Sequence, residues 1–235
     1  MDTVAVLLAA GAGRRLGGHC KALLRVGGET LLARQCNAMQ AAGIRDLVVM
    51  IGAEAEKVQR ELAHLQDRCD GMTIQSVPVG LVSENQQDSV RAGVRFLSQH
   101  PGFGNPQQGV LFSLVDLPLL TSSDIAAVLQ CAMQNGTLVV VPTLAAATDS
   151  TDSAASAVAQ PGHPIWLSAR LLQNVDHQQP EFSLKRLIAQ QRADHAESVA
   201  FMASTAPGYF MDVDTPQDVA DLAARYDLAI TIDPA

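Results

Sequence analysis

Short apolar runs alternate along the chain with longer segments in which apolar residues recur at helical spacing. The apolar runs predict strands at residues 3–10, 47–52, 72–77, 110–115 and 137–142. Several are apolar at consecutive positions, which is typical of strands buried on both faces of a sheet. The segments of helical period lie at residues 30–42, 54–66, 84–99 and 122–134. This alternation predicts an α/β fold with a doubly wound, mainly parallel sheet and helices on both faces.

Helix start signals support this pattern at three places. In residues 83–86, 121–124 and 215–218, a serine or threonine precedes by three positions a polar residue that can complete a capping box. Pro216 then falls in the first turn of the last helix, where proline is tolerated. We therefore expect a further helix from about residue 215.

Composition limits the class of protein. A chain of 235 residues, 48% of them hydrophobic, can bury a large core, and we expect one domain over residues 1–235. The net charge of −8 argues against a broad basic face, and hence against a nucleic-acid or anionic membrane partner. No apolar run approaches the roughly 20 residues that span a bilayer, and the N-terminus lacks a basic leader, so we expect a soluble cytoplasmic protein. The four cysteines show no C-x-x-C spacing, which predicts reduced thiols.

One segment departs from the alternation. Residues 145–160, AAATDSTDSAASAVAQ, contain small polar residues and alanines without a clear period. Such a composition buries too little apolar surface to order itself strongly, so we expect a mobile insertion. It can be a passive surface loop, or a lid over a site at the end of the preceding strand.

The first predicted strand leads into a glycine-rich turn, residues 11–21. Gly11 and Gly13 let successive main-chain N–H groups turn toward one point, where they can bind an anion, and Arg14, Arg15 and Lys21 add positive charge. The turn is not a Walker loop, because no hydroxyl residue follows the lysine. It is not the dinucleotide fingerprint either, because its third glycine comes one residue late. The chemistry indicated is a polyphosphate site.

The motif Leu8-Ala9-Ala10-Gly11-Ala12-Gly13-Arg14-Arg15-Leu16-Gly17, followed by Lys21, resembles the MobA-like nucleotidyltransferases, and most closely their molybdenum cofactor cytidylyltransferase branch. The resemblance implies a Rossmann-like nucleotidyltransferase fold. It also implies transfer of a nucleoside monophosphate to a phosphorylated acceptor, with release of pyrophosphate. On this resemblance the triphosphate is held by Gly11, Gly13, Arg15 and Lys21, and further nucleotide contacts come from Leu8, Ala9, Ala10 and Ser89. The guanylyl branch has glycine in place of Ala10, so the β-carbon here favours a pyrimidine, and CTP is the expected nucleotide.

A second matching element is Leu114-Val115-Asp116-Leu117-Pro118, at the end of a predicted strand. Thr121 is already expected to cap the next helix, which leaves the Asp116 carboxylate available for a cation. In the family this aspartate binds magnesium, and the resemblance gives Asp116 that role.

The third element contains Asp212 and Asp214, which alternate onto one face of an extended segment. Two carboxylates so close repel each other unless a positive charge lies near, and a divalent ion supplies one. The resemblance implies that Asp214 ligates magnesium while Asp212 orients a neighbour through hydrogen bonds. Alternatively, both acids only favour the start of the last helix through its dipole.

These parts imply a mechanism of positioning and electrostatics. Magnesium held by Asp116 and Asp214 would bridge the nucleotide phosphates, while Lys21 and Arg15 neutralise the same oxygens, so that Lys21, Arg15 and Asp116 are the expected catalytic residues. The acceptor phosphate is already anionic at neutral pH, so its in-line attack needs no general base.

The acceptor half matches the family less well. In residues 84–93, ENQQDSVRAG, only Ser89 and Gly93 fit the branch pattern. Gly162, His163 and Pro164 resemble an element that approaches the acceptor, although His163 can equally be a packed polar residue. Residues 179–188 depart from the branch, and there Lys185 or Arg186 either meets an anionic acceptor or faces solvent.

The expected activity is therefore a magnesium-dependent cytidylyltransferase acting on molybdopterin or its molybdenum form, and a molybdoenzyme partner is compatible with it. Two alternatives remain open. The acceptor can be a sugar phosphate or another small phosphate, or the protein can be a non-catalytic carrier of a nucleotide or pterin. The glycine spacing argues against a third reading, a dinucleotide-dependent oxidoreductase.

Overall fold

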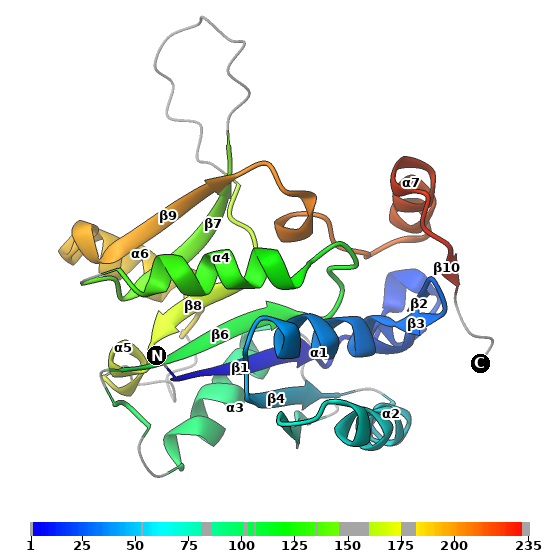
Figure 1. Ribbon diagram of the computed structural model, residues 1–235, viewed down its shortest axis with the longest axis horizontal. Coiled ribbons are helices and arrows are strands. Elements are labelled where there is room, and N and C mark those ends of the chain that lie inside the picture. Colours follow the sequence, from blue (N-terminus) through cyan, green and yellow to red (C-terminus); the bar gives the residue numbers. More distant parts are fainter. Residues whose placement is uncertain are drawn as a thin grey trace, which may run out of the picture.

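The computed structural model describes residues 2–52, 54–80, 86–100, 103–105, 107–134, 136–145, 160–174 and 182–231. A seven-stranded sheet lies at its centre, in the order β5-β4-β1-β6-β8-β7-β9 (Figure 1). The strands are β1 (Asp2–Ala9), β4 (Asp46–Ile51), β5 (Thr73–Pro78), β6 (Gln108–Leu114), β7 (Val139–Leu144), β8 (Ile165–Ser168) and β9 (Val199–Ser204). All pairings are parallel except those of β8, which runs antiparallel to β6 and β7. The doubly wound, mainly parallel sheet expected from the sequence is confirmed.

The helices divide between the two faces of the sheet. They are α1 (Leu31–Ala41), α2 (Ala55–Arg68), α3 (Gln86–Ser98), α4 (Ser122–Ala132), α5 (Ala169–Gln173), α6 (Leu184–Asp194) and α7 (Pro216–Tyr226). One hydrophobic core packs α1, α2 and α4 against Ala5 and Leu7, and a second packs α3, α5 and α6 against Val6 and Leu8. Because alternate residues of a strand point to opposite faces, the apolar run of β1 serves both cores. In Figure 1, α1 and α4 lie in front of the sheet.

Two of the predicted helix starts have complete capping boxes. Thr121 accepts a hydrogen bond from Asp124 N at the start of α4, and Thr215 accepts one from Asp218 N at the start of α7. In both, the aspartate carboxylate accepts a hydrogen bond from the N-cap main chain in return. The third signal, at residues 83–86, lies largely outside the described residues, as does most of the expected insertion at residues 145–160.

The chain order produces a crevice at the carboxyl ends of two central strands. From β1 the chain passes through α1 to β4 on one side, and it later returns through α3 to β6 on the other side of β1. The carboxyl ends of β1 and β6 therefore meet at a topological switch point, where ligands bind in open α/β sheets. Near these carboxyl ends, a small sheet joins β2 (Arg25–Val26), β3 (Glu29–Thr30) and β10 (Ile230–Thr231) (Figure 1).

Two further expectations concern cysteines and membranes. All four cysteines lie in the described part of the chain and none forms a disulfide; burial raises the pKa of the Cys20 and Cys36 thiols. Among the described helices, none has the length and apolar character needed to cross a bilayer.

Candidate functional site

The glycine-rich turn leaves β1 in a conformation that requires glycine at one position. Gly13 has φ +56°, and a β-carbon there would lie 1.9 Å from the main-chain oxygen of His19. The Gly13 carbonyl accepts hydrogen bonds from the N–H groups of Leu16 at 2.8 Å and Gly18 at 3.0 Å, which closes the turn. A β-carbon on Gly11, by contrast, would meet nothing within 4 Å. Gly13 therefore shapes the turn, and Gly11 borders open space.

Lys21 joins the turn to acids from two distant parts of the chain. Its Nζ lies 2.5 Å from Asp116 Oδ2 and also forms an ion pair with Asp214 Oδ1. Burial on its own lowers the pKa of Lys21, but the two carboxylates outweigh it, so the pKa is raised and the ammonium is held charged. Arg15 reaches Asp214 Oδ2 at 3.1 Å from a more exposed position, with 71% of its side chain accessible against 13% for Lys21.

The Asp116 loop is anchored by main-chain and side-chain hydrogen bonds. Val213 N donates to the Asp116 carbonyl at 2.9 Å, which ties the two acid-bearing segments together. From α1, Gln35 donates to the carbonyl of Leu117 at 2.8 Å and Arg34 to the carbonyl of Pro118 at 3.0 Å. Sequence reasoning missed Arg34 and Gln35, because nothing in a helical pattern shows which distant carbonyls its polar residues will meet.

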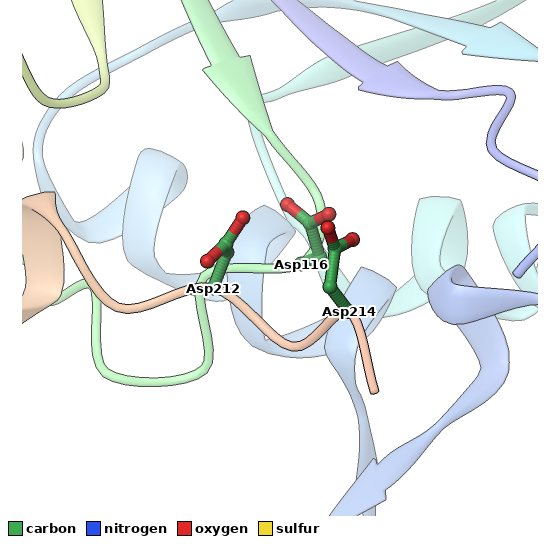
Figure 2. A group of neighbouring side chains, drawn as sticks. All are labelled: Asp116, Asp212 and Asp214. Carbon is green, nitrogen blue, oxygen red and sulfur yellow. The ribbon is translucent and has the colours of Figure 1, made fainter. Parts of the chain in front are cut away.

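Three carboxylates converge beside Lys21. Asp116, Asp212 and Asp214 each offer an oxygen, and these oxygens lie within 4.8 Å of one another (Figure 2). Partial burial and the neighbouring charges of Asp116 and Asp214 raise the pKa of Asp212. Asp116 Oδ1 is buried and has no hydrogen-bond partner in the described part of the chain. Carboxylate oxygens are the ligands that magnesium and manganese prefer, so this donor set fits a divalent ion.

The main-chain N–H groups at the start of the last helix are capped by a residue other than Asp212 or Asp214. Asp218 Oδ2 accepts hydrogen bonds from Thr215 N at 2.7 Å and Asp214 N at 3.0 Å at the beginning of α7. The Asp214 carboxylate instead lies beside that of Asp116 (Figure 2) and forms an ion pair with Lys21.

A cavity of about 430 Å³ lies over these groups at the carboxyl ends of β1 and β6. Its lining includes most of the residues expected to bind the nucleotide or the metal, namely Leu8, Ala10, Gly11, Gly13, Arg15, Lys21, Ser89, Asp116, Asp212 and Asp214. Arg14 and Gln86 line it as well. The side chain of Ala9 is buried in the core instead, so a nucleotide contact there would involve its main chain.

The expected acceptor element packs beside the segment that carries Asp212. His163 N donates to the Tyr209 carbonyl at 2.9 Å, and a β-carbon on Gly162 would lie 2.5 Å from the same oxygen. Burial lowers the pKa of His163, which favours the neutral imidazole. Gly162 and His163 line a second cavity next to the first, whereas Pro164 is buried and is not part of its lining.

Comparison with known proteins finds a family that covers most of the chain. A family model described as "MobA-like NTP transferase domain" matches residues 5–196. A bifunctional protein GlmU from Pelotomaculum thermopropionicum is 47% identical over 66 residues, which cover 28% of this chain and 14% of that protein. The matched segments span only 14% to 28% of the curated relatives.

Two solved structures show the same fold over nearly the whole chain. The 4-diphosphocytidyl-2C-methyl-D-erythritol synthase of Anaerococcus prevotii has a TM-score of 0.70 at 15% identity, covering 96% of each chain. Rv0371c of Mycobacterium tuberculosis, solved in complex with manganese, has a TM-score of 0.61 at 23% identity, covering 96% of this chain and 100% of that one.

Proposed function

Because the chain belongs to the MobA-like NTP transferase family, we propose that it is a metal-dependent nucleotidyltransferase. It transfers a nucleoside monophosphate from a nucleoside triphosphate to a phosphorylated acceptor and releases pyrophosphate. One observation carries the proposal. Lys21 from the glycine turn, Asp116 from the end of β6 and Asp214 from the far end of the sequence meet in one ion-paired cluster at the switch point of the sheet.

The residues present support a place for the triphosphate and for a divalent ion. The glycine turn faces the cavity with the main chain of Gly11 and with the cations Arg15 and Lys21, which suits a triphosphate. Asp116 and Asp214 would hold a divalent ion, and Asp212 would orient that pair or complete the ligand set. When bound, magnesium supplies concentrated positive charge against the phosphate oxygens. The manganese complex of a structural neighbour supports a divalent ion without distinguishing magnesium from manganese.

The chain's own residues then provide positioning and charge. Lys21 neutralises negative charge that develops on the phosphate oxygens. Its salt bridges with Asp116 and Asp214 hold its ammonium group at the wall of the cavity. Arg15, being exposed, can move with the entering triphosphate. No general base is required, since the acceptor phosphate is anionic at neutral pH.

For the nucleotide, CTP is favoured. Ala10 lines the cavity, where its β-carbon would narrow the space beside a base. The likeness to a diphosphocytidyl-methylerythritol synthase supports a cytidylyl reaction in the same fold without extending to this chain's substrate.

For the acceptor, molybdopterin or its molybdenum form follows from the branch that the turn motif resembles, and a molybdoenzyme would then receive the product. A sugar phosphate is the second candidate for the acceptor. One solved structure with a similar fold has the description "Putative Glucose-1-Phosphate Thymidylyltransferase". A non-catalytic carrier would have no need for Lys21 and the acids to converge. The single domain over residues 1–235 and the lid role of residues 145–160 stay predictions.

The test is pyrophosphate release from each of the four nucleoside triphosphates, with magnesium, and with molybdopterin present or absent. We expect release from CTP that depends on both magnesium and molybdopterin. Release that requires glucose 1-phosphate in place of molybdopterin would favour the sugar-phosphate alternative. Nucleotide binding without release under any of these conditions would favour the carrier.

A further inference from the structure

Two adjacent side chains of α1 hold the loop that follows Asp116. Gln35 Nε2 donates a hydrogen bond to the carbonyl of Leu117 at 2.8 Å. Arg34 Nη2 donates to the next carbonyl, that of Pro118, at 3.0 Å. Because the peptide bond is planar, a hydrogen bond to a carbonyl restrains the direction of its whole peptide group. The helix α1 therefore sets the course of the main chain as it leaves Asp116.

The main chain around Asp116 is anchored on its other side as well. Val115 N donates to the Leu8 carbonyl near the end of β1 at 3.2 Å. Val213 N donates to the carbonyl of Asp116 itself at 2.9 Å. The Asp116 side chain thus leaves the main chain from a point that is held before and after it. Its carboxylate keeps little freedom beyond rotation about its own side-chain bonds.

The two oxygens of this carboxylate have different surroundings. Oδ2 of Asp116 lies 2.5 Å from Lys21 Nζ. Oδ1 is buried, and no described residue donates a hydrogen bond to it. A buried oxygen without a partner is costly, and a divalent ion shared with Asp212 and Asp214 would compensate it (Figure 2). The direction in which Asp116 is held therefore matters for metal binding.

Stability alone does not explain why Gln35 is buried here. It is 1% exposed, and its Oε1 has no hydrogen-bond partner in the described part of the chain. The Leu117 carbonyl also accepts from Leu120 N at 3.3 Å, so it would keep a partner without Gln35. An apolar side chain of similar length would avoid the unpartnered oxygen. The hydrogen bond is better explained by the loop geometry that it fixes.

Arg34 gives the same indication. Its Nη1 lies 3.9 Å from Glu29 Oε2, a long ion pair between side chains that are about one-third exposed, and such a pair contributes little stability. Its Nε is buried and has no partner among the described residues. The shorter contact is the hydrogen bond to the Pro118 carbonyl. Arg34 is therefore engaged mainly with the loop that carries Asp116.

Building on the proposed function, we propose that Gln35 and Arg34 are positioning residues for the metal site. They hold the main chain at Asp116 so that its carboxylate reaches Lys21 and stays beside the oxygens of the other two acids. Neither is among the residues that line the nucleotide cavity, so they act through Asp116 rather than on the nucleotide. Their loss weakens metal binding and leaves the nucleotide contacts in place.

The test is a manganese titration without nucleotide, followed by electron paramagnetic resonance. Gln35→Met keeps the length of the side chain and removes its donor. We expect its Kd for manganese to rise about tenfold, the lower end of the effect of groups that orient metal ligands, because Gln35 acts through the main chain. Arg34→Met should raise the Kd severalfold. Removing a positive charge near the site would by itself strengthen cation binding, so weaker binding in this variant reports lost positioning.

Gln191→Met is the matched control. Gln191 is also buried, with 8% exposed, and its Nε2 donates to Ser198 Oγ at 2.8 Å. Ser198 directly precedes β9, so this hydrogen bond lies at the amino ends of the parallel strands, whereas Asp116 follows the carboxyl end of β6. Both glutamine variants should lower the Tm by at most about 2–4 °C. Only Gln35→Met should weaken manganese binding.

Steady-state pyrophosphate release gives a second readout, with the nucleoside triphosphate that supports turnover. The magnesium concentration at half-maximal rate should rise about tenfold in Gln35→Met. At saturating magnesium, kcat and the KM for the nucleotide should return close to the wild-type values, because the nucleotide contacts are intact. Gln191→Met should need no more magnesium than the wild type. A lowered kcat that magnesium does not restore would contradict a role in metal binding.

The outcomes separate this inference from the proposed function. If Gln35→Met and Arg34→Met bind manganese as the wild type does, while Asp116→Asn has lost it, the inference is overturned and the proposed function stands. Equal weakening in Gln191→Met would also overturn the inference, because the effect would then follow from a general loss of stability. Manganese binding that Asp116→Asn does not weaken would contradict the proposed metal site itself, and with it any role of α1 there.

Discussion

Replacing Lys21 by methionine tests the ion-paired cluster in the absence of any substrate. Lys21→Met keeps an unbranched apolar side chain of similar reach and removes the charge that pairs with Asp116 and Asp214. The Lys21 and Asp116 side chains are only 13% and 15% exposed, so the carboxylates left behind cannot recover full hydration. Removing one partner of a buried ion pair costs about 3–5 kcal/mol, and the greater exposure of Asp214 favours the lower end, about 3 kcal/mol.

Arg15→Met is the matched control, because Arg15 contacts the same Asp214 from a side chain that is 71% exposed. An exposed ion pair contributes about 0–1 kcal/mol, so this variant should lose little stability. In a chain of this size, about 1 kcal/mol corresponds to about 2–4 °C in Tm. Differential scanning calorimetry should therefore show a fall of about 6–12 °C for Lys21→Met and of at most about 4 °C for Arg15→Met.

Magnesium or manganese should then reduce the difference in Tm between Lys21→Met and Arg15→Met, since a divalent ion supplies the positive charge that Lys21→Met lacks. At a concentration about a hundredfold above its Kd, the ion would add about 2.7 kcal/mol to the stability of the folded state. Equal loss of stability in the two variants without metal would refute the reasoning that Lys21 compensates buried carboxylates. A Lys21→Met protein that metal does not stabilise would refute the view that these carboxylates are metal ligands.

Three further outcomes follow. Asp116→Ala should lower turnover in the pyrophosphate assay by about a hundredfold or more, and near wild-type turnover would contradict its role. Gly13→Ala should cost more than about 2 kcal/mol in urea unfolding, because it combines a left-handed φ with a main-chain clash, whereas Gly18→Ala, which meets no neighbour, should cost about 1 kcal/mol. Burial lowers the pKa of His163 below that of the unfolded chain, so the stability held by the neutral imidazole is present above about pH 6.5 and is lost as pH falls. The wild type should therefore lose more stability than His163→Asn between about pH 7.5 and 5.5, and parallel losses in urea unfolding would contradict this.

Much of the fold was predictable because local signals and tertiary structure agree. The apolar run of β1 serves both cores, and the boxes at Thr121 and Thr215 mark where α4 and α7 begin. Residue type and a place directly after a strand mark Gly13 and Asp116 as candidate site residues. The rule that ligands bind at the carboxyl ends of parallel strands then predicted where they would meet.

Other parts were not predictable, for identifiable reasons. β8 has only four residues and runs antiparallel within the sheet, so it offers only a short signal. β9 carries five consecutive apolar residues from Val199 to Ala203, but as an edge strand its residues alternate in exposure, which that run does not show. Arg34 and Gln35 contact the Asp116 loop only because the fold brings α1 beside carbonyls that lie 84 and 82 residues further along the chain. The double ion pair of Lys21 depends on long-range approach in the same way, since it joins residues separated by 95 and 193 positions.

The most direct test of the central claim is a manganese titration followed by electron paramagnetic resonance, with a non-hydrolysable CTP analogue present. The account predicts that the wild type binds manganese together with the nucleotide at one site, and that Asp116→Asn and Asp214→Asn abolish this binding while remaining folded. Manganese and nucleotide binding of wild-type strength in both variants would contradict the account.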